Sequence, residues 1–301
     1  MNPFETLTSV EDRSVNHVAR TPDGGYWEAR FVQRQDDYFI CYVSSHTGCN
    51  QSCRFCHLTA TGQTTMTPAT VDDYLAQIAP VLGTYRQRLA QGWSRATKMH
   101  YNFMARGEPL ANPHFLRDSQ AVFDGMGMQA AELDLPASFK VSSILPHTLD
   151  EDLVQVLADP RAELYYSLYS VRPAFRKRWL PKALPAEEGL DRVADYQRRT
   201  GRRVVLHWAF IAGENDSEAD VAELLEAVAQ RGIRAKFNLV RYNPHDARHG
   251  VESTQDVLDA RFAQIQTALQ QLGGGQGSRQ VPRVGFDVKA SCGMFIEPSE
   301  A

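Results

Sequence analysis

The chain has 301 residues, of which 43% are hydrophobic and 23% charged, so it can bury one large core or two modest ones. No stretch approaches the ~20 consecutive apolar residues of a membrane span, and no charged head followed by an apolar run opens the sequence, so we expect a soluble, cytoplasmic protein without membrane contacts. The formal net charge of -4 excludes a protein that binds nucleic acid over its whole surface, and leaves room only for a local basic patch.

The predicted elements begin with a β-hairpin extension in residues 1–35, because a Pro-Asp-Gly-Gly turn at 22–25 separates two patterned runs; we expect this hairpin to lie across the barrel that follows. Short β-branched and aromatic runs then predict six strands, at 38–45, 99–104, 139–143, 163–170, 203–211 and 235–242. Amphipathic spacing predicts helices between them, including 71–89 and a helix through 221–228 capped by Asp216 or Ser217.

The C-terminal part continues with a glycine-rich loop at 273–278, a last strand at 281–288 and a tail that carries Cys292. Alternation of strands and helices predicts an α/β fold with parallel strands and helices packed outside them. We therefore expect one core domain at 36–301 with small appendages, rather than two domains.

The five cysteines, Cys41, Cys49, Cys53, Cys56 and Cys292, are an odd number with four inside sixteen positions, which favours a metal or cluster site in a reducing compartment. Three thiolates at 49, 53 and 56 can hold three irons of a [4Fe-4S] cluster and leave the fourth iron open to a small molecule. The alternative is a structural zinc site with Cys41 or His57 as fourth ligand, but such sites usually show paired Cys-x2-Cys knuckles.

The Cys49-x3-Cys53-x2-Cys56 triplet resembles the signature of the radical S-adenosylmethionine superfamily, in which the open iron chelates S-adenosylmethionine and reduction yields a 5'-deoxyadenosyl radical. Four further segments are similar to motifs of the RlmN/Cfr group, which methylates adenine carbons (C2 or C8) in rRNA or tRNA. These segments are 43–45 (VSS), 106–112 (RGEPLAN), 242–244 (YNP) and 290–293 (ASCG). The resemblance spans residues 28–293 and implies a partial (β/α)6 barrel, a monomer, and an electron donor such as flavodoxin or ferredoxin.

The resemblance also implies which residues contact S-adenosylmethionine. Gly107 and Glu108 would form the edge that receives its methionine part, since a carboxylate accepts from an ammonium group and glycine lets the backbone approach. Four polar residues match positions that contact its ribose, carboxylate or adenine: Ser142, Ser167, Tyr169 and Asn243. The family usually has histidine where this chain has Tyr169, and each residue taken singly is also a plausible cap or turn residue.

Cys292 matches the cysteine that carries the transferred methyl group in the RlmN/Cfr mechanism. A thiolate is a suitable nucleophile to take a methyl group, and the resulting thioether then loses a hydrogen atom and adds to adenine. The alternative for a lone cysteine is a small buried hydrophobe.

Two further catalytic assignments depart from the family pattern. Tyr42 occupies the position of the family's resolving cysteine, and Cys41 lies one residue earlier, so that either a bulge returns Cys41 to the pocket or Cys41 belongs to the core. Glu28 aligns approximately with a hairpin glutamate that takes a proton from the substrate carbon, and an exposed strand carboxylate is the alternative.

The substrate is the least determined part of the sequence-based hypothesis. A basic stretch at 172–182 includes Phe175 and Trp179 as candidate stacking surfaces for unstacked nucleotides, and a solvated helix face is the alternative. We expect no counterpart of the relatives' N-terminal helical domain. Three hypotheses follow: methylation of an adenine carbon in RNA, a related radical reaction on a nucleotide, DNA or small metabolite, and a non-enzymatic zinc protein.

Overall fold

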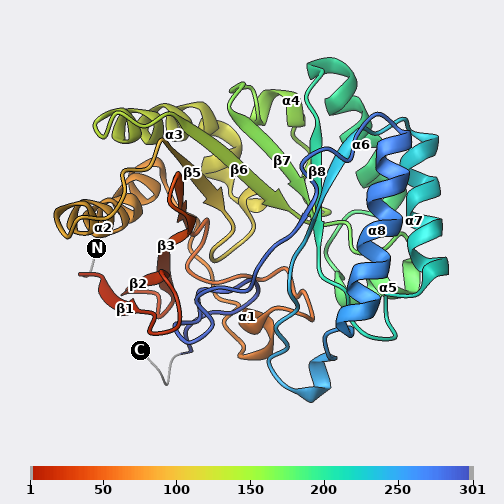
Figure 1. Ribbon diagram of the computed structural model, residues 1–301, viewed down its shortest axis with the longest axis horizontal. Coiled ribbons are helices and arrows are strands. Elements are labelled where there is room, and N and C mark those ends of the chain that lie inside the picture. The colour runs from red at the N-terminus through yellow and green to blue at the C-terminus, as the bar shows by residue number, and fades with distance from the viewer. Residues whose placement is uncertain (1–2, 298–301) are drawn as a thin grey trace.

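The computed structural model describes residues 3–297, which form one sheet of ten strands in the order β1 to β10, with helices along its outer side (Figure 1). The strands are β1 (Glu5–Thr8), β2 (Val15–Arg20), β3 (Tyr26–Gln35), β4 (Tyr38–Tyr42), β5 (Lys98–Phe103), β6 (Ala137–Ser143), β7 (Ala162–Tyr166), β8 (Val204–Trp208), β9 (Ala235–Leu239) and β10 (Arg279–Gln280). From β4 to β10 all pairs are parallel.

The six predicted core strands are confirmed as β4 to β9, and all but β6 end before the predicted limit. The residues just beyond the strands turn into loops at the carboxyl edge; Tyr169, for example, has a left-handed φ of 59°. These loops collect polar residues at one end of the sheet, where α/β folds place their active sites. The β1 and β10 edges are unpaired on their outer sides in the described chain, so the sheet is a partial barrel.

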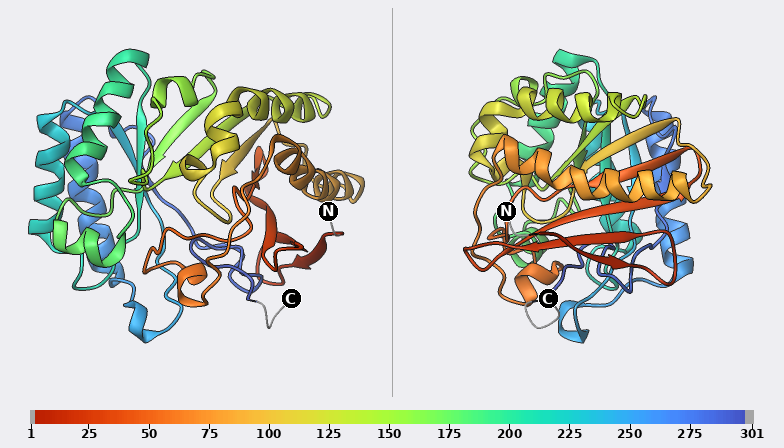
Figure 2. Two further views of the ribbon diagram at one scale, coloured as in Figure 1. Left: turned by 180° about the vertical axis from the view of Figure 1, so that it is seen from behind. Right: turned by 90° about the vertical axis from the view of Figure 1, so that its left-hand side faces the viewer.

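The longer helices form an arc outside the strands, as Figure 2 shows from two further directions. They are α2 (Val71–Ala90), α3 (Pro113–Ala131), α6 (Ala186–Thr200), α7 (Glu218–Gln230) and α8 (Gln255–Gln271), and the short ones are α1 (His57–Ala60), α4 (Leu153–Val156) and α5 (Pro173–Trp179). The predicted helix 71–89 is confirmed as α2, and Ser217 caps α7 in a capping box with Asp220. No helix in residues 3–297 is both long and apolar enough to cross a membrane.

The N-terminal extension differs from the prediction in its placement. The turn at 22–25 does join two antiparallel strands, β2 and β3, but β3 also pairs antiparallel with β4, and β1 adds a third strand. The hairpin therefore continues the sheet instead of lying across the barrel. The boundary between residues 35 and 36 as a domain division stays a prediction.

The predicted last strand at 281–288 is wrong. The strand that follows α8 is β10, which has two residues and pairs with β9, whereas 281–288 is irregular. Pro282 has no amide hydrogen to donate, and Gly285 has a φ of 62°, so neither suits a continuing strand. This segment instead brings Val284 against Ile40 and Tyr38 of β4, and leads into the tail.

The two faces of the central sheet differ in character. Along β4, Phe39, Cys41 and Val43 belong to the main apolar core under the helices, while the alternating residues Ile40 and Tyr42 face the other way. The inner face carries many polar side chains, which line a cavity.

Candidate active site

A cavity occupies the inner side of the sheet and is lined by residues at the carboxyl ends of the strands. Its wall contains most of the residues singled out from the sequence: Cys49, Cys53, Cys56, Gly107, Glu108, Ser142, Ser167, Tyr169, Asn243 and Cys292. Cys41 and Glu28 are not part of this wall. The cavity thus brings together segments far apart in the sequence, such as Cys49 and Cys292, which are 243 residues apart.

The cysteine loop between β4 and α1 is held by its backbone. The Cys49 amide donates to the Gln63 carbonyl at 3.0 Å, and the Cys56 amide donates to the Cys53 carbonyl at 3.0 Å. Burial raises the pKa of Cys49 to about 12 and that of Cys56 to about 11. The three neighbouring cysteines repel one another as thiolates, and a bound cationic cluster would relieve that repulsion.

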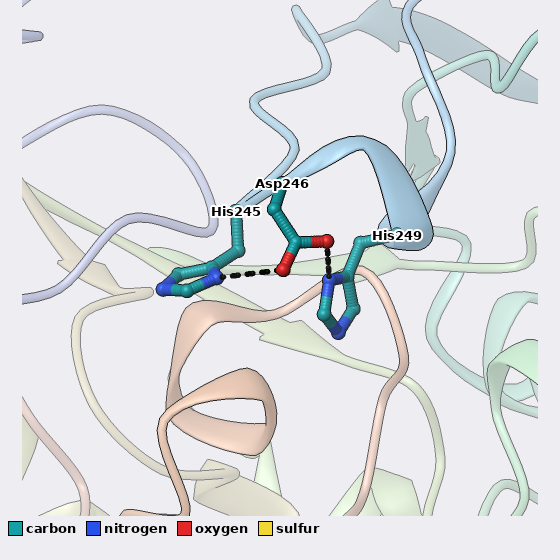
Figure 3. A group of neighbouring side chains, drawn as sticks. All are labelled: His245, Asp246 and His249. Carbon is teal, nitrogen blue, oxygen red and sulfur yellow. Dashed lines mark hydrogen bonds and ion pairs between the residues drawn. The ribbon is translucent and has the colours of Figure 1, made fainter.

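The sulfurs of Cys49, Cys53 and Cys56 do not all lie within 4.8 Å of one another. A tetrahedral ion with ~2.3 Å bonds needs sulfurs about 3.8 Å apart. Among residues 3–297, the one group of three or more ligand atoms within 4.8 Å of one another is His245, Asp246 and His249, which contains no cysteine (Figure 3). The zinc hypothesis therefore finds no geometric support at the triplet.

The group in Figure 3 fixes the loop that follows β9. The Asp246 carboxylate accepts from His249 Nδ1 at 2.8 Å and from Arg248 Nη2 at 2.7 Å, and these contacts lower its pKa. The His245 ring meets the His57 ring edge to face at 5.1 Å, directly beside the cysteine loop. His57 Nε2 also lies 3.1 Å from the Asn243 carbonyl, so His57 connects two loops of the cavity.

Gly107 and Glu108 form a tight edge after β5. A Cβ at Gly107 would lie 2.5 Å from Ser45 Oγ, and its φ of 92° is unfavourable for other residues, so glycine is required there. Glu108 accepts hydrogen bonds from the amides of Leu110 at 3.0 Å and Ile144 at 3.1 Å. Burial raises the pKa of Glu108 to about 7, and an ammonium group in the cavity would favour its ionised form.

The four other polar residues expected around S-adenosylmethionine also reach the cavity. Ser142 Oγ at the end of β6 and Ser167 Oγ, directly after β7, are 3.4 Å apart. The ring of Tyr169 stacks on Phe55 of the cysteine loop with 4.4 Å between centroids. Asn243 donates its amide to the Cys292 carbonyl at 2.8 Å, so part of its capacity is used to hold the tail.

The tail around Cys292 is held from three sides. The Gly293 carbonyl accepts from the His57 amide at 3.0 Å, and Arg30 donates to the carbonyls of Ser291 at 3.3 Å and Met294 at 2.7 Å. The thiol of Cys292 is exposed to the cavity although protein surrounds it, and burial raises its pKa while Arg30 and Arg34 oppose that rise. A thiol in a fixed position beside the three cluster cysteines is suited to group transfer.

Glu28 does not have the surroundings of a substrate base. Its carboxylate is fully buried and pairs with Arg30 at 2.7 Å and Arg106 at 2.8 Å. It also accepts from the Ile296 amide at 3.0 Å, and the two guanidinium groups lower its pKa. The geometry makes Glu28 the anionic centre of a clamp on the tail, which neither the proton-transfer prediction nor the exposed-strand alternative anticipated.

Cys41 belongs to the core, which was one of its two predicted alternatives. β4 is regular at this point, with Cys41 opposite Phe31 and Tyr42 opposite Arg30, so no bulge turns the thiol toward the cavity. Its side chain is inaccessible and burial raises its pKa strongly. The role of a resolving cysteine has no support in this arrangement.

The aromatic residues of the basic stretch are also in the core. Phe175 is 4% exposed and Trp179 is 1% exposed, so neither can stack on a nucleotide, and the prediction of stacking surfaces is wrong. Most nearby arginines on the helix surfaces pair with acids, such as Arg178 with Glu214 and Arg199 with Asp152. This part of the patch is mainly a solvated, ion-paired face.

The sequence pattern missed the residues that hold the tail. Arg30 and Arg106 are buried arginines whose side chains reach the carbonyls of 291, 294 and 296. Arg106 begins the RGEPLAN segment, but its task could be assigned only when the tail was seen beside it.

Known proteins and solved structures resemble this chain over most of its length. No family model matches the chain. A probable dual-specificity RNA methyltransferase RlmN from Synechococcus sp. is 28% identical over 95% of this chain and 77% of its own length. A second probable RlmN, from Aquifex aeolicus, is 28% identical over 81% of this chain and 67% of its own length. A radical SAM methyltransferase structure from Sphaerobacter thermophilus superposes with a TM-score of 0.75 at 22% identity, over 98% of this chain and 81% of that one.

Three loop cysteines at the carboxyl end of β4 in a partial α/β barrel are the arrangement expected of a radical S-adenosylmethionine enzyme. SuiB from Streptococcus suis, solved with S-adenosylmethionine bound, shares the fold with a TM-score of 0.54 at 12% identity, over 84% of this chain and 52% of that one. Within that class, the chain is similar to the RlmN methyltransferases.

Proposed function

We propose that this enzyme transfers a methyl group, by way of Cys292, to an sp2 carbon of adenine in RNA, at C2 or C8 of an rRNA or tRNA nucleotide. The observation that carries the proposal is the position of Cys292, whose thiol faces the same cavity as Cys49, Cys53 and Cys56 on a tail fixed by Asn243 and Arg30. The RNA substrate follows the names of the relatives, which are RNA methyltransferases.

Cys49, Cys53 and Cys56 would hold a [4Fe-4S] cluster, and S-adenosylmethionine bound to it supplies a hydrogen-abstracting 5'-deoxyadenosyl radical upon one-electron reduction. Gly107 and Glu108 would receive the methionine part, because the Glu108 carboxylate can accept from its ammonium group. Ser142, Ser167, Tyr169 and Asn243 would contact the remaining polar groups from the other strand ends.

The chemistry assigned to Cys292 has two stages. Its thiol loses a proton to solvent, and the sulfur displaces the sulfonium sulfur of one S-adenosylmethionine, so that a carbon–sulfur bond forms at Cys292 and S-adenosylhomocysteine leaves. The S-methyl group would later give up one hydrogen atom to the 5'-deoxyadenosyl radical, which becomes 5'-deoxyadenosine, and the methylene carbon would form a new carbon–carbon bond with adenine. Cys41 lies on the opposite face of β4, away from this adduct.

We expect the enzyme to be a cytoplasmic monomer that receives electrons from a small electron-transfer protein such as flavodoxin or ferredoxin. Contact with RNA phosphates would start at Arg54 in the cysteine loop, which donates to the Arg248 carbonyl at 2.7 Å and lies over Trp179. A local cationic edge of this kind is compatible with the net charge of -4.

The decisive experiment is an anaerobic assay with methyl-labelled S-adenosylmethionine, offered total RNA and free nucleosides in parallel. We expect label in 2- or 8-methyladenosine from RNA and a methylated Cys292 in mass spectra of the tail peptide. The Cys292→Ala variant should lose both signals while it keeps the brown colour of the cluster. Label confined to the free nucleosides would refute the RNA substrate, and a Cys292 that is never methylated would refute the methyl-carrier role.

A further inference from the structure

The interior of the sheet contains buried polar atoms that no protein group satisfies. Asn102 is 7% exposed and Asn238 2% exposed, and the Oδ1 atom of each lacks a hydrogen-bond partner in the described chain. His207 Nδ1 and Arg34 Nε are likewise buried without a partner. All four residues line the cavity. An unsatisfied buried polar atom costs about 1–3 kcal/mol, so four together indicate an occupant that is absent from the protein itself.

Three of these residues face the cavity from within the central strands. Asn102 belongs to β5, and His207 and Asn238 are register partners on β8 and β9. Ser142, one of the residues expected to contact S-adenosylmethionine, lies in the register row of Val205, two residues before His207. The four residues with unsatisfied atoms, called the polar layer below, therefore share one cavity with the expected cofactor contacts.

Some charged side chains near this layer form ion pairs, and others have no carboxylate partner. Glu163 accepts from Lys140 at 2.6 Å and from Lys236 at 3.3 Å, so these three compensate one another. Arg34 has Tyr42 Oη as its hydrogen-bond partner, at 3.3 Å, and no carboxylate pairs with it or with Arg279 in residues 3–297. The layer therefore combines neutral hydrogen-bonding groups with uncompensated positive charge.

Arg34, His207 and the catalytic cysteine Cys292 line the same cavity. Burial lowers the pKa of His207 to about 4, so its ring is neutral and can donate at one nitrogen and accept at the other. A ligand that contacts Arg34 and His207 therefore occupies the cavity that Cys292 faces.

We propose that Arg34, Asn102, His207 and Asn238 form the substrate subsite of the enzyme and hold an adenine nucleotide unit, with the base against Asn102, His207 and Asn238 and its phosphate toward Arg34 and Arg279. The two Asn oxygens match an exocyclic amino group, and the Arg34 Nε and imidazole donors match the ring nitrogens of adenine. A base in this place has left its stack, as nucleotides modified at a ring atom generally must.

This assignment rests on the proposed function for the identity of the base, but its test does not. The probe is adenosine 5'-monophosphate, titrated anaerobically into the cluster-loaded enzyme without reductant and with saturating S-adenosylmethionine, so that the probe cannot take the cofactor's place. We expect one binding site in the wild type, and a dissociation constant raised about tenfold in His207→Phe and in Asn238→Leu, which each remove one hydrogen bond.

The matched control is His114→Phe, which makes the same chemical change at an exposed position of α3 and should bind the probe as the wild type does. Cluster absorbance and far-ultraviolet circular dichroism identify any variant that fails to fold, and Arg34→Gln then provides a third test of the same subsite. The rate of Cys292 methylation should stay unchanged in the control variant His114→Phe.

Absence of binding to the wild type, or equal binding to the wild type and both subsite variants, would overturn the subsite and leave water as the occupant of the layer. That result would not affect Cys292 methylation. Conversely, if the enzyme binds the probe through His207 and Asn238 but never methylates Cys292, the subsite proposal stands and the proposed function is refuted.

Discussion

Cys41 and Cys292 show how the orientation of one side chain separates a core residue from a reactive one. Both are thiols whose pKa is raised by burial, but Cys41 faces the helices from β4, whereas Cys292 faces the cavity from the tail. Side chains alternate between the two faces of a strand, so Cys41 faces the core while its neighbour Tyr42 faces the cavity. The two cysteines should respond to substitution in opposite ways.

Cys41→Ala should keep full methyl transfer to RNA and lose about 1 kcal/mol of stability, since it removes a small group from a packed core. Activity on RNA and the urea midpoint measure the two effects. Cys292→Ala is the companion variant, with normal stability and no transfer. Accumulation of a covalent RNA–protein adduct in Cys41→Ala would instead show that Cys41 resolves the intermediate.

Gly107→Ala is expected to weaken cofactor binding. The added Cβ would meet Ser45 Oγ at 2.5 Å and the His46 backbone nitrogen at 2.7 Å, and the φ of 92° adds strain, so the Arg106–Glu108 edge must move. We expect a loss of about 2 kcal/mol in stability and a lower affinity for S-adenosylmethionine. Equilibrium binding to the cluster-loaded protein tests this, with Gly213→Ala as a control at a positive φ with open space around it.

The sequence could predict single residues where spacing carries the chemistry. Cys49, Cys53 and Cys56 are close in sequence, so their shared loop is a local property. The clamp formed by Glu28, Arg30 and Arg106 was not predictable in this way, because these side chains bind the backbone of residues 291–296, more than 180 residues away. Backbone acceptors leave no trace in side-chain patterns.

At the scale of elements, the tail acts as a distinct functional segment even though it forms no helix or strand. It is tied to β2 through Asn16, which donates to the Val288 carbonyl at 3.0 Å, and to β3 through Arg30. The Arg30 and Arg106 guanidinium groups also lie over the Phe295 ring. The N-terminal strands therefore serve as the support on which the reactive cysteine is held.

Glu28→Gln tests this support. Removing the charge leaves two buried guanidinium groups without their carboxylate, which costs about 3 kcal/mol. We expect a lower urea midpoint and slower methylation of Cys292, because the tail loses its anchor. Glu5→Gln, on the exposed strand β1, is the matched control and should change neither. If Glu28 served only as a base for the substrate, Cys292 methylation would proceed at the normal rate.

The predictions for two segments were wrong because they relied on the types of residue present and not on the spacing of the apolar residues. Phe175 and Trp179 are four residues apart on α5, so they share one helix face, and their rings lie 5.9 Å apart against the core. The strand expected at 281–288 failed for a similar reason, since its apolar residues pack as an irregular cover around Pro282. The long amphipathic helix α2, by contrast, was predicted nearly to its ends because its periodicity extends over 20 residues.

At the scale of the whole molecule, several buried histidines make stability dependent on pH. Burial lowers the pKa of four of them to about 4: His17, His46, His100 and His207. Because the unfolded chain binds these protons near pH 6.5, it gains protons before the folded state does. Stability that is present above about pH 6.5 is therefore lost as the pH falls toward 4.

His17 offers a clean measurement because it lies outside the cavity, between Thr6 Oγ1 at 3.1 Å and Thr84 Oγ1 at 3.0 Å. It should account for about 2 kcal/mol of the stability lost between pH 7 and pH 5. Urea unfolding of His17→Gln should show a correspondingly smaller loss, while His114→Gln, at an exposed site, should follow the wild type. Identical pH profiles for His17→Gln and the wild type would contradict the assignment.

The attachment of the tail also determines an order of assembly. Residues 288–296 are synthesised after every strand of the sheet, and the Gly293 carbonyl closes onto the His57 amide, next to the last cysteine of the loop. Until that bond forms, the tail is not held beside the cysteine loop. We therefore expect that cluster insertion precedes docking of the tail, so that a maturing chain acquires its metal centre before it acquires a methyl carrier.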